Sequence, residues 1–323
     1  MNILFIGCGF YNYDSYICEE LKKSCSVTYI SESHYRKKFP YLTYFIWNRL
    51  KQRKLIEWIE GLYIEKIIRR TKDIDTVFLI YGPNSSLTEK HICQIEKLHP
   101  SAAFVLYLWD AWYRIDKKDM LLTHFKNIYS FDTEDCMKYG FKHRPLFYST
   151  PPVIGKAPKI YDISNVGVGH SNRLESLSKI KKICIDNGIK YYFHLVIGTR
   201  IYYVWKYFKK NQCSFYMDII AKDALPYSEY LRVVDSSKAI IDFPHPTQCG
   251  LTMRTIEALS RGVKVVTSNK YIRNHKDIPE SMYLVLDESF TAKKLVDFLS
   301  RSDSSSLPER YSLPAFLAEV LGI

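Results

Sequence analysis

The sequence predicts an α/β protein with two Rossmann-like lobes, each built around a parallel sheet. Short apolar runs alternate with helical patterns along nearly the whole chain, which is typical of βα units. A Pro-rich connector over residues 148–158 interrupts this alternation near the middle of the chain. The length of 323 residues suits two domains of ordinary size, and 47% hydrophobic and 25% charged residues are globular proportions.

The first lobe is predicted to span residues 1–150. Its apolar runs predict strands over residues 3–7, 27–30, 76–81, 104–109 and 128–131, with helices that include 86–98 and 133–139. The first apolar run follows no positively charged region and leads into a Gly-containing loop, so we expect a strand there and not a signal peptide. No apolar run approaches the ~20 residues that a membrane span needs.

The second lobe is predicted to span residues 151–305. Strands are predicted over 161–167, 191–197, 238–243, 263–267 and 283–286, and helices over 173–187, 202–210, 227–236 and 292–300. A Ser-rich stretch over residues 300–306 then precedes a short final helix near 314–321.

The most informative segment covers residues 238–269 and reads as a strand–loop–helix–strand unit. A loop with two prolines and Gly250 follows the first strand, a helix is predicted over about 251–261, and Gly262 stands where a glycine commonly ends a helix. The loop thus brings backbone N–H groups, Thr252 and Arg254 to a helix start at the carboxyl end of a strand. Such a place suits a phosphate. An ordinary αβ crossover is the alternative interpretation.

Two side chains of this helix suggest a nucleotide in particular. Arg254 lies in the first turn, where the helix dipole disfavours a cation, and a bound diphosphate would remove that conflict. Glu257 lies about one turn further on, within reach of a ribose hydroxyl.

Residues 256–263, IEALSRGV, resemble the donor-nucleotide motif of GT-B glycosyltransferases. The longer segment is most similar to bacterial enzymes of lipopolysaccharide or capsular polysaccharide synthesis. In such enzymes a glycine-led helix start faces the diphosphate, and the glutamate holds the ribose. The sequence departs from retaining members at Cys249, with Gln248 beside it, where these often carry a second glutamate. The motif therefore predicts the diphosphate and ribose end of a donor and leaves the sugar open.

The resemblance implies the GT-B fold, with two lobes facing an interdomain cleft and residues 306–323 forming a terminal helix that can cross back to the first lobe. It implies a metal-independent, hexosyltransferase-type enzyme that needs no cofactor, because the nucleotide sugar is a substrate. The implied acceptor is a bacterial cell-surface glycan, lipid-linked or not. The residues that it assigns to the donor are Gly167, His170, Arg173, Leu225, Tyr227, Gly250, Leu251, Thr252, Arg254, Glu257 and Lys270. Local roles in loops, at the start of a helix or in solvent remain alternatives for His170, Arg173, Tyr227 and Lys270.

The first lobe offers candidates for the acceptor side. Its first strand leads into Gly7-Cys8-Gly9, but Asn12 stands where a dinucleotide fingerprint needs a third glycine, so NAD binding is not favoured. By resemblance this loop, with Gly9, shapes the acceptor and sugar sites. Asp110 follows the fourth predicted strand and is our first candidate for a catalytic base, with Trp109 beside it as a sugar-stacking ring. A helix-capping or turn aspartate beside core tryptophans is the alternative. Asp14 is the second candidate, with helix capping as its alternative role.

The cysteines and carboxylates predict no metal site. Eight cysteines form no C-x-x-C pair, which favours reduced thiols and a cytoplasmic location. No pair of aspartates stands at a strand–loop junction in the manner of a metal site, and cations with a helix dipole can neutralise a leaving diphosphate.

The net charge of +12 predicts an anionic partner, and much of it is local. Residues 36–72 hold eleven Lys and Arg against three Glu, with interleaved aromatic residues. One interpretation is a helix that packs an apolar stripe of Leu55, Ile59, Leu62, Tyr63 and Ile67 on the sheet behind a solvated basic face. The other is contact with the inner membrane surface, which would make the protein peripheral. A sugar-nucleotide epimerase of the GT-B fold and a basic nucleic-acid-binding protein are alternative functions, although nucleic acid is not the partner we expect.

Overall fold

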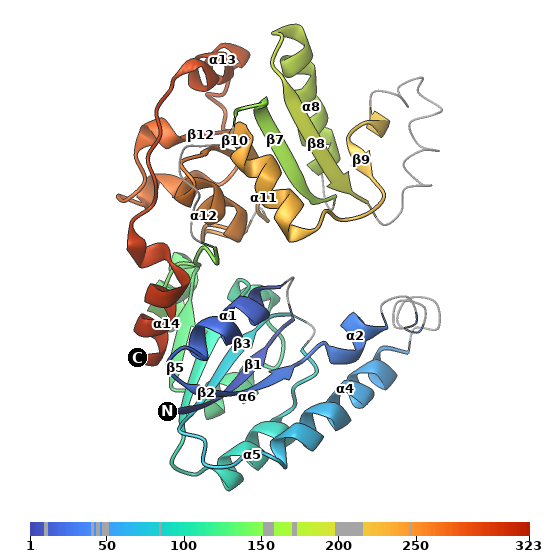
Figure 1. Cartoon of the computed structure of the whole chain (residues 1–323), viewed down its shortest axis with the longest axis vertical. Helices are drawn as coiled ribbons and strands as arrows, with labels where there is room; N and C mark the ends of the chain where they lie inside the picture. The colour runs from blue at the N-terminus through green and yellow to red at the C-terminus, as the bar shows by residue number, and fades with distance from the viewer. Residues whose placement is uncertain are drawn as a thin grey trace. The chain divides into compact units, whose positions relative to one another are not determined.

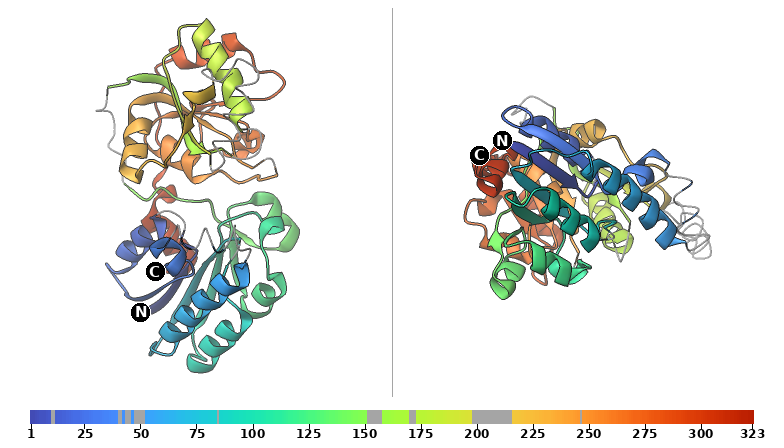
Figure 2. Two further views of the ribbon diagram at one scale, coloured as in Figure 1. Left: turned by 90° about the vertical axis from the view of Figure 1, so that its right-hand side faces the viewer. Right: turned by 90° about the horizontal axis from the view of Figure 1, so that it is seen from below.

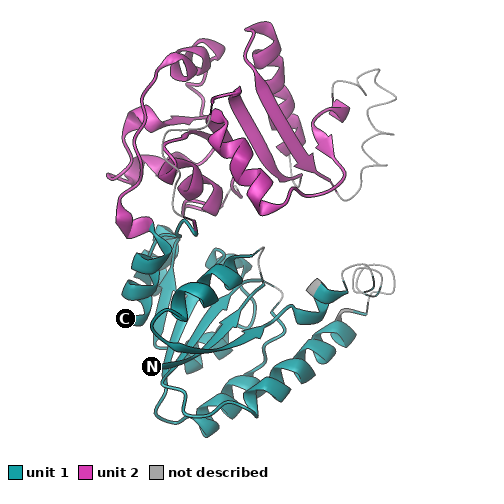
Figure 3. Cartoon of the chain, viewed as in Figure 1, with its two compact units in different colours: residues 1–149, 312–323 teal, residues 150–311 magenta. Residues whose placement is uncertain are grey.

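The computed structural model describes residues 1–9, 12–39, 42, 46, 52–83, 85–150, 158–169, 173–197, 216–245 and 247–323. The chain divides into two compact units (Figure 3). The first contains Met1–Ser149 together with Ser312–Ile323, and the second contains Thr150–Tyr311. The helix predicted over 202–210 lies outside the described residues.

The first unit is built on a six-stranded parallel sheet in the order β2-β1-β3-β4-β5-β6 (Figure 1). Five strands confirm the prediction to within about one residue at each end. The sixth, β6, was not predicted because it has only two residues. The strands are β1 (Asn2–Gly7), β2 (Ser26–Ser31), β3 (Thr76–Tyr81), β4 (Ala103–Leu108), β5 (Asn127–Ser130) and β6 (Lys142–His143).

Helices cover both faces of this sheet, because alternate strand residues point to opposite sides. Leu4 and Ile6 share a core with α4, α5 and α6, whereas on the other face Tyr107 packs against Phe316 of α14. Helix α1 lies beside α14. The described helices are α1 (Tyr13–Leu21), α2 (His34–Lys38), α4 (Arg53–Ile68), α5 (Glu89–Leu98), α6 (Lys118–His124), α7 (Thr133–Tyr139) and α14 (Leu313–Leu321), with a 3-10 turn η2 (Trp112–Arg114). In the part of the chain described, no helix combines the length and the apolar character needed to cross a bilayer.

The apolar stripe predicted for α4 is confirmed for Tyr63 and Ile67, which are half-buried and pack against the core, and is wrong for Leu55 and Leu62. The helix buries Ile56, Ile64 and Ile68, which recur every four or eight residues, whereas Leu55 and Leu62 are exposed. Glu60 lies within the buried face and is fully covered. Its carboxylate accepts a hydrogen bond of 2.9 Å from the backbone N–H of Arg36. The pairing with α2 thus selects a face that hydrophobicity alone does not indicate.

The second unit has another six-stranded parallel sheet, in the order β12-β11-β10-β7-β8-β9. All five predicted strands are confirmed, and the two-residue strand β9 was not predicted. The strands are β7 (Tyr161–Val168), β8 (Tyr191–Val196), β9 (Ile220–Ala221), β10 (Ser237–Asp242), β11 (Lys264–Thr267) and β12 (Tyr283–Val285).

Helices again pack on both faces of the sheet (Figure 2). Helices α8 and α13 share a core with Ile163 and Ile241, and α11 and α12 contact β10. Gly262 ends α12 with φ of 66°, and a Cβ there would stand 2.5 Å from the hydroxyl oxygen of Ser304, so the predicted helix-ending glycine is confirmed. The helices are α8 (Arg173–Asp186), α11 (Tyr227–Asp235), α12 (Met253–Ser260) and α13 (Ala292–Ser300), with 3-10 turns η3 (Lys270–Asn274), η4 (Glu280–Met282) and η5 (Glu309–Tyr311).

The strand orders locate the place where each unit would bind a ligand. In an open parallel sheet, ligands bind beyond the carboxyl ends of the strands at the point where the strand order reverses. That point lies between β7 and β10 in the second unit and between β1 and β3 in the first. The loops after these four strands are therefore the candidate sites.

Candidate functional site

Asp242, the last residue of β10, organises the start of α12. Its carboxylate is buried, with 1% exposure, and accepts hydrogen bonds from the hydroxyls of Thr252 and Thr255 at 2.6 and 2.9 Å. It also accepts a hydrogen bond from Nε of Arg254 at 2.9 Å. Thr252 caps the helix by accepting a hydrogen bond from the backbone N–H of Thr255. The sequence predicts Asp242 only as a residue of the strand over 238–243, and its position near the carboxyl end of that strand is the signal that points to it.

This carboxylate changes the explanation for Arg254. We expected a bound diphosphate to compensate for a cation in the first helical turn, but the buried charge of Asp242 already does so. The guanidinium is thereby fixed beside the helix start through Nε, with 28% of the side chain exposed. The helix start is thus preorganised in the structure itself.

Glu257 is also part of an internal network. Its side chain is 1% exposed and accepts a short hydrogen bond from the hydroxyl of Tyr227, the first residue of α11. Burial and the Glu257 carboxylate raise the pKa of nearby Tyr230 well above its usual value. Glu257 therefore lies at the α11–α12 contact as a partner of two tyrosines, and a ribose would have to share or replace the contact with Tyr227.

The strand β7 lies next to β10 in the sheet. Asn165 joins the two strands directly, since its side-chain amide donates to the carbonyl of Ile241 at 2.8 Å. Gly167 has open space beside its Cα, whereas a Cβ on Gly169 would stand 2.5 Å from Ile197. Arg173, at the start of α8, donates from its guanidinium to the carbonyl of Val168 at 3.0 Å. His170 lies outside the described residues.

Asn269 holds the loop that contains Gly250. Its side-chain amide donates to the carbonyls of Cys249 and Gly250, both at 3.1 Å. Gly250 and Leu251 are buried, Leu225 is half-buried, and Lys270 is exposed, with its ammonium 5.5 Å from the centre of the Tyr271 ring. Of the predicted donor residues, the structure thus gathers Gly250, Leu251, Thr252 and Arg254 around one helix start.

In the first unit, Gly7 and Gly9 lie close to Asp14. This carboxylate is buried and accepts hydrogen bonds from the backbone N–H of Gly9 at 2.9 Å and the hydroxyl of Tyr29 at 2.6 Å. A Cβ on Gly7 would stand 2.4 Å from the same carboxylate, and Gly9 has φ of 75°. The two glycines therefore make room for Asp14. It does not cap α1, whose N-cap is Asn12.

Asp110 and Trp109 differ in their surroundings. Asp110 follows β4, retains 15% exposure of its side chain and accepts a hydrogen bond from Arg114 at 3.1 Å. Trp109 is 9% exposed and packs against Tyr13 and Phe147 in the aromatic core. The expectation that the Trp109 ring presents a face to a sugar is therefore not met by the described structure.

Glu32, which follows β2, is a buried carboxyl that the candidate list did not contain. It is 1% exposed and accepts a hydrogen bond of 2.7 Å from the hydroxyl of Ser85, in the segment after β3. Burial raises its pKa to about 7, although the Ser85 hydrogen bond and the charges of Arg36 and Lys117 lower it. Lys117 also donates to the carbonyl of Ser85 at 2.6 Å. The network thus connects the residue after β2 to the segments after β3 and β4.

The raised pKa of Glu32 predicts a pH dependence of stability. A carboxyl whose folded pKa lies above its unfolded pKa stabilises the fold at low pH, and this contribution is lost as the pH rises through about 7. We expect Glu32→Gln to gain about 2 kcal/mol of unfolding free energy relative to wild type between pH 5 and pH 8. Denaturant unfolding at both pH values measures this. Glu19→Gln, at an exposed position, is the control. If the difference in unfolding free energy between Glu32→Gln and wild type were the same at both pH values, the prediction would be contradicted.

Several solved structures resemble this chain in fold, although its sequence does not match theirs closely. Neither a protein-family model nor a curated protein matches the amino-acid sequence. An α-glucosyltransferase solved with UDP and DNA matches with a TM-score of 0.58 at 14% identity, over 99% of this chain and 96% of that one. HepE of Anabaena, solved with UDP-glucose, matches with a TM-score of 0.57 at 9% identity, over 100% and 98%. The UDP-GlcNAc 2-epimerase of Methanocaldococcus jannaschii gives 0.56 at 11%, over 100% and 99%.

The chain has the GT-B fold. Two six-stranded parallel sheets with helices, together with matches that cover nearly the full length of each protein, establish this. At these identities the likeness extends to the fold alone. The start of α12 lies at the strand-order reversal of the second unit and is the candidate anion-binding site.

Proposed function

We propose that this protein is a glycosyltransferase that moves a sugar from a nucleotide-sugar donor to a glycan acceptor. The observation that carries the proposal is the start of α12, which Asp242 preorganises at the carboxyl end of β10. The first N–H groups of a helix have no partner within the helix and attract an anion. Proteins of the same fold have been solved in complex with UDP and with UDP-glucose, which supports a nucleotide sugar as the substrate.

In this proposal the donor diphosphate contacts the first turn of α12. Arg254, anchored through Nε, adds positive charge next to the diphosphate, and charge of this kind stabilises the leaving nucleoside diphosphate without a metal ion. Gly167, near the end of β7, and Arg173, at the start of α8, act on the same ligand, together with His170. Leu225 and Tyr227 lie on the side of the nucleoside, whose ribose binds Glu257.

The catalytic base in this proposal is Asp110. A base must accept the proton of the attacking acceptor hydroxyl, and Asp110 combines a strand-end position with partial exposure. Asp14 fits this role less well, because Gly9 and Tyr29 already donate to its buried carboxylate. We assign Asp14 to positioning the loop after β1.

Thermal-shift measurements with UDP, GDP, dTDP, ADP and CMP test the donor site. We expect one of these nucleotides to raise the melting temperature of the wild-type protein, because a ligand bound only by the folded state stabilises it. Glu257→Ala should weaken binding at least about tenfold, since a hydrogen bond to a charged group contributes about 1.5–3 kcal/mol.

Two further variants serve as controls for this experiment. Tyr227→Phe removes the hydroxyl that occupies Glu257 and should keep nucleotide affinity or improve it. Asp110→Asn should keep nucleotide binding and lose sugar transfer. Unchanged affinity in Glu257→Ala would reject the ribose assignment, and normal turnover in Asp110→Asn would reject the base.

A sugar-nucleotide epimerase is the second candidate, because one match of the same fold is a UDP-GlcNAc 2-epimerase. The two functions differ in their need for an acceptor. Conversion of a nucleotide sugar to its epimer in the absence of any acceptor would favour the epimerase, whereas release of nucleoside diphosphate that depends on added glycan would favour the transferase.

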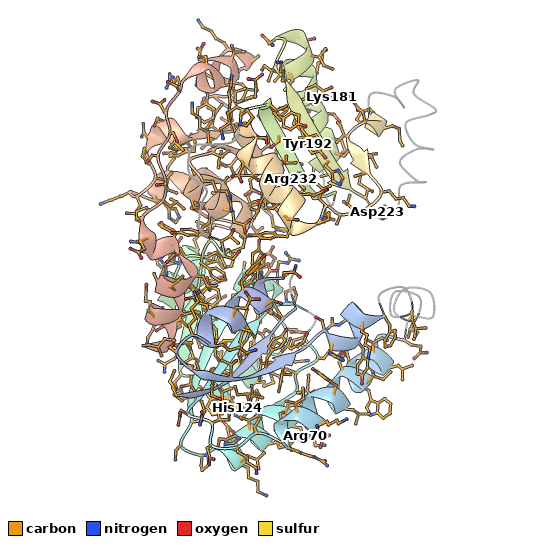
Figure 4. The ribbon with its side chains drawn as sticks, in the orientation of Figure 1. Arg70, His124, Lys181, Tyr192, Asp223 and Arg232 are labelled. Atoms are coloured by element: carbon orange, nitrogen blue, oxygen red, sulfur yellow. The ribbon has the colours of Figure 1, made fainter. Side chains whose placement is uncertain are left out.

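The acceptor that we propose is a cell-surface glycan of the lipopolysaccharide, O-antigen or capsule class, reached at the inner membrane surface. The observation that supports this is the exposed face of α4. Leu55, Trp58 and Leu62 are 41%, 61% and 47% exposed and follow helical spacing. Lys54, Lys66 and Arg70 are exposed on the same helix or just after it, and Figure 4 labels Arg70. Apolar side chains flanked by cations suit the interface of an anionic bilayer.

Vesicle co-sedimentation tests this membrane proposal. We expect wild-type protein to bind vesicles with anionic lipid, and Trp58→Ser with Leu62→Ser to reduce binding at least about tenfold through lost apolar burial. Met137→Ser is the matched control, since Met137 is an exposed apolar residue of α7, with 79% exposure. Equal binding by the double variant and the control would refute the α4 contact.

A further inference from the structure

Helix α5 presents three side chains of metal-ligand type on one face. Glu89, Cys93 and Glu96 follow the spacing i, i+4, i+7, which places them along one side of a helix. His124, the last residue of α6, approaches the same side. The ligand atoms of Cys93, Glu96 and His124 all lie within 4.8 Å of one another. These residues belong to helices and not to the loops proposed for sugar transfer.

His124 is held between two carboxylates (Figure 4 labels it). Its side chain is only 10% exposed, Nδ1 lies 2.8 Å from a carboxylate oxygen of Glu96, and Nε2 lies 3.5 Å from one of Glu89. Nε2 is buried and makes no hydrogen bond within the described residues. A histidine that binds a metal usually directs its second ring nitrogen at an outer carboxylate, and Glu89 has that place.

We propose that Cys93, Glu96 and His124 bind one zinc-like divalent ion. A thiolate, a carboxylate and an imidazole form a mixed set of sulfur, oxygen and nitrogen ligands that suits Zn²⁺, whereas Mg²⁺ and Ca²⁺ require oxygen ligands. The ion replaces the proton between Nδ1 and Glu96; the imidazole then ligates through Nδ1 and carries its one proton on Nε2, on the side of Glu89, while the thiol proton and any further proton go to solvent. Cys93 is exposed, so water can complete the coordination.

A bound ion would join α5 to the end of α6 and thereby stabilise the first unit. The sequence did not reveal this set, since its members span 93–124 without the short Cys and His spacings of zinc motifs. Binding to the folded state alone raises the melting temperature in proportion to the logarithm of metal concentration above the dissociation constant.

Titration of the metal-free, full-length protein with Zn²⁺, in competition with a chromophoric chelator, tests the proposal. We expect one ion per chain, and at least about a tenfold loss of affinity in Cys93→Ser and in His124→Gln. Substitution with Co²⁺ should give a thiolate-to-cobalt charge-transfer band that Cys93→Ser removes. Cys25→Ser, at a half-buried thiol after α1, is the matched control and should keep wild-type affinity.

Two results would overturn the proposal: no stoichiometric Zn²⁺ binding by the wild type, or equal affinities in Cys93→Ser and Cys25→Ser. Because His124 is half-buried between two carboxylates and its replacement can impair folding, the exposed Cys93 provides the deciding variant. Glu89→Gln should give a smaller loss than Cys93→Ser, since it alters an outer partner and leaves the three ligands in place.

Discussion

Asp242→Ala should abolish nucleotide binding and lower the stability of the second unit by about 3 kcal/mol. The substitution leaves the two threonine hydroxyls and the Arg254 guanidinium without their shared acceptor. The buried Thr255 hydroxyl alone costs about 1–3 kcal/mol when it is left unsatisfied, and the half-buried Thr252 and Arg254 add less. It also frees the Arg254 guanidinium from its place beside the helix start, so the anion site loses both its geometry and its fixed guanidinium. Calorimetric nucleotide titration and denaturant unfolding measure the two effects.

The matched control for this prediction is Asp162→Ala. Asp162 is a carboxylate of the same sheet, near the amino end of β7, and it pairs with Lys238 at 2.7 Å. Its loss should cost stability but leave nucleotide affinity intact. If Asp242→Ala does not fold, Asp242→Asn keeps the shape and removes the charge. Wild-type nucleotide affinity in a folded Asp242 variant would contradict the assignment of the donor site.

Removal of residues 312–323 should unfold the first unit, although these residues are the last in the chain. Leu313, Phe316, Leu317 and Val320 of α14 are all buried, and burial of each such side chain contributes about 1.5–3 kcal/mol. Their sum is comparable to the ~5–15 kcal/mol that stabilises a whole domain. Buried Arg144 would also lose Glu319, whose carboxylate lies 3.0 Å from Nε.

A single substitution in α14 measures part of its contribution to the stability of the first unit. Phe316→Ala should cost about 3–5 kcal/mol of unfolding free energy, because the ring packs against Tyr107 and Phe147. Ile323→Ala, at an exposed position just beyond the same helix, should change stability by less than about 0.5 kcal/mol. Proteolysis and circular dichroism of the truncated chain report whether the first unit folds, and native-like stability without α14 would refute its structural role.

Strand and helix positions were predictable because they depend on local periodicity. The strand at 76–81 and the helices at 133–139 and 292–300 agree with the predicted bounds at every residue. Asp132 caps α7 as its position before an acidic first turn suggests, accepting from the backbone N–H groups of Glu134 and Asp135. Among the described residues, the two-residue strands were missed, α5 begins three residues later than predicted, and α4 buries Glu60, whose carboxylate accepts from the backbone N–H of Arg36.

The candidate site was predictable only in outline. The segment around 238–269 indicated an anion-binding helix start at the end of a strand, and the structure places Thr252 and Arg254 there. It did not indicate that Asp242 would neutralise Arg254, or that Tyr227 would donate to Glu257, because both contacts depend on how segments separated by 12 and 30 residues approach each other.

The sequence by itself determined the succession of βα units and the chemistry available at the start of α12, because backbone periodicity and helix capping are encoded within a few neighbouring residues. Only the tertiary structure decided which charges meet. Packing buries Glu32 and Asp242, turns Leu55, Trp58 and Leu62 of α4 to the outside, and brings Cys93 to His124. Burial and distance set the pKa values, ion pairs and ligand sets of a protein, and both arise only when segments far apart in the chain pack together.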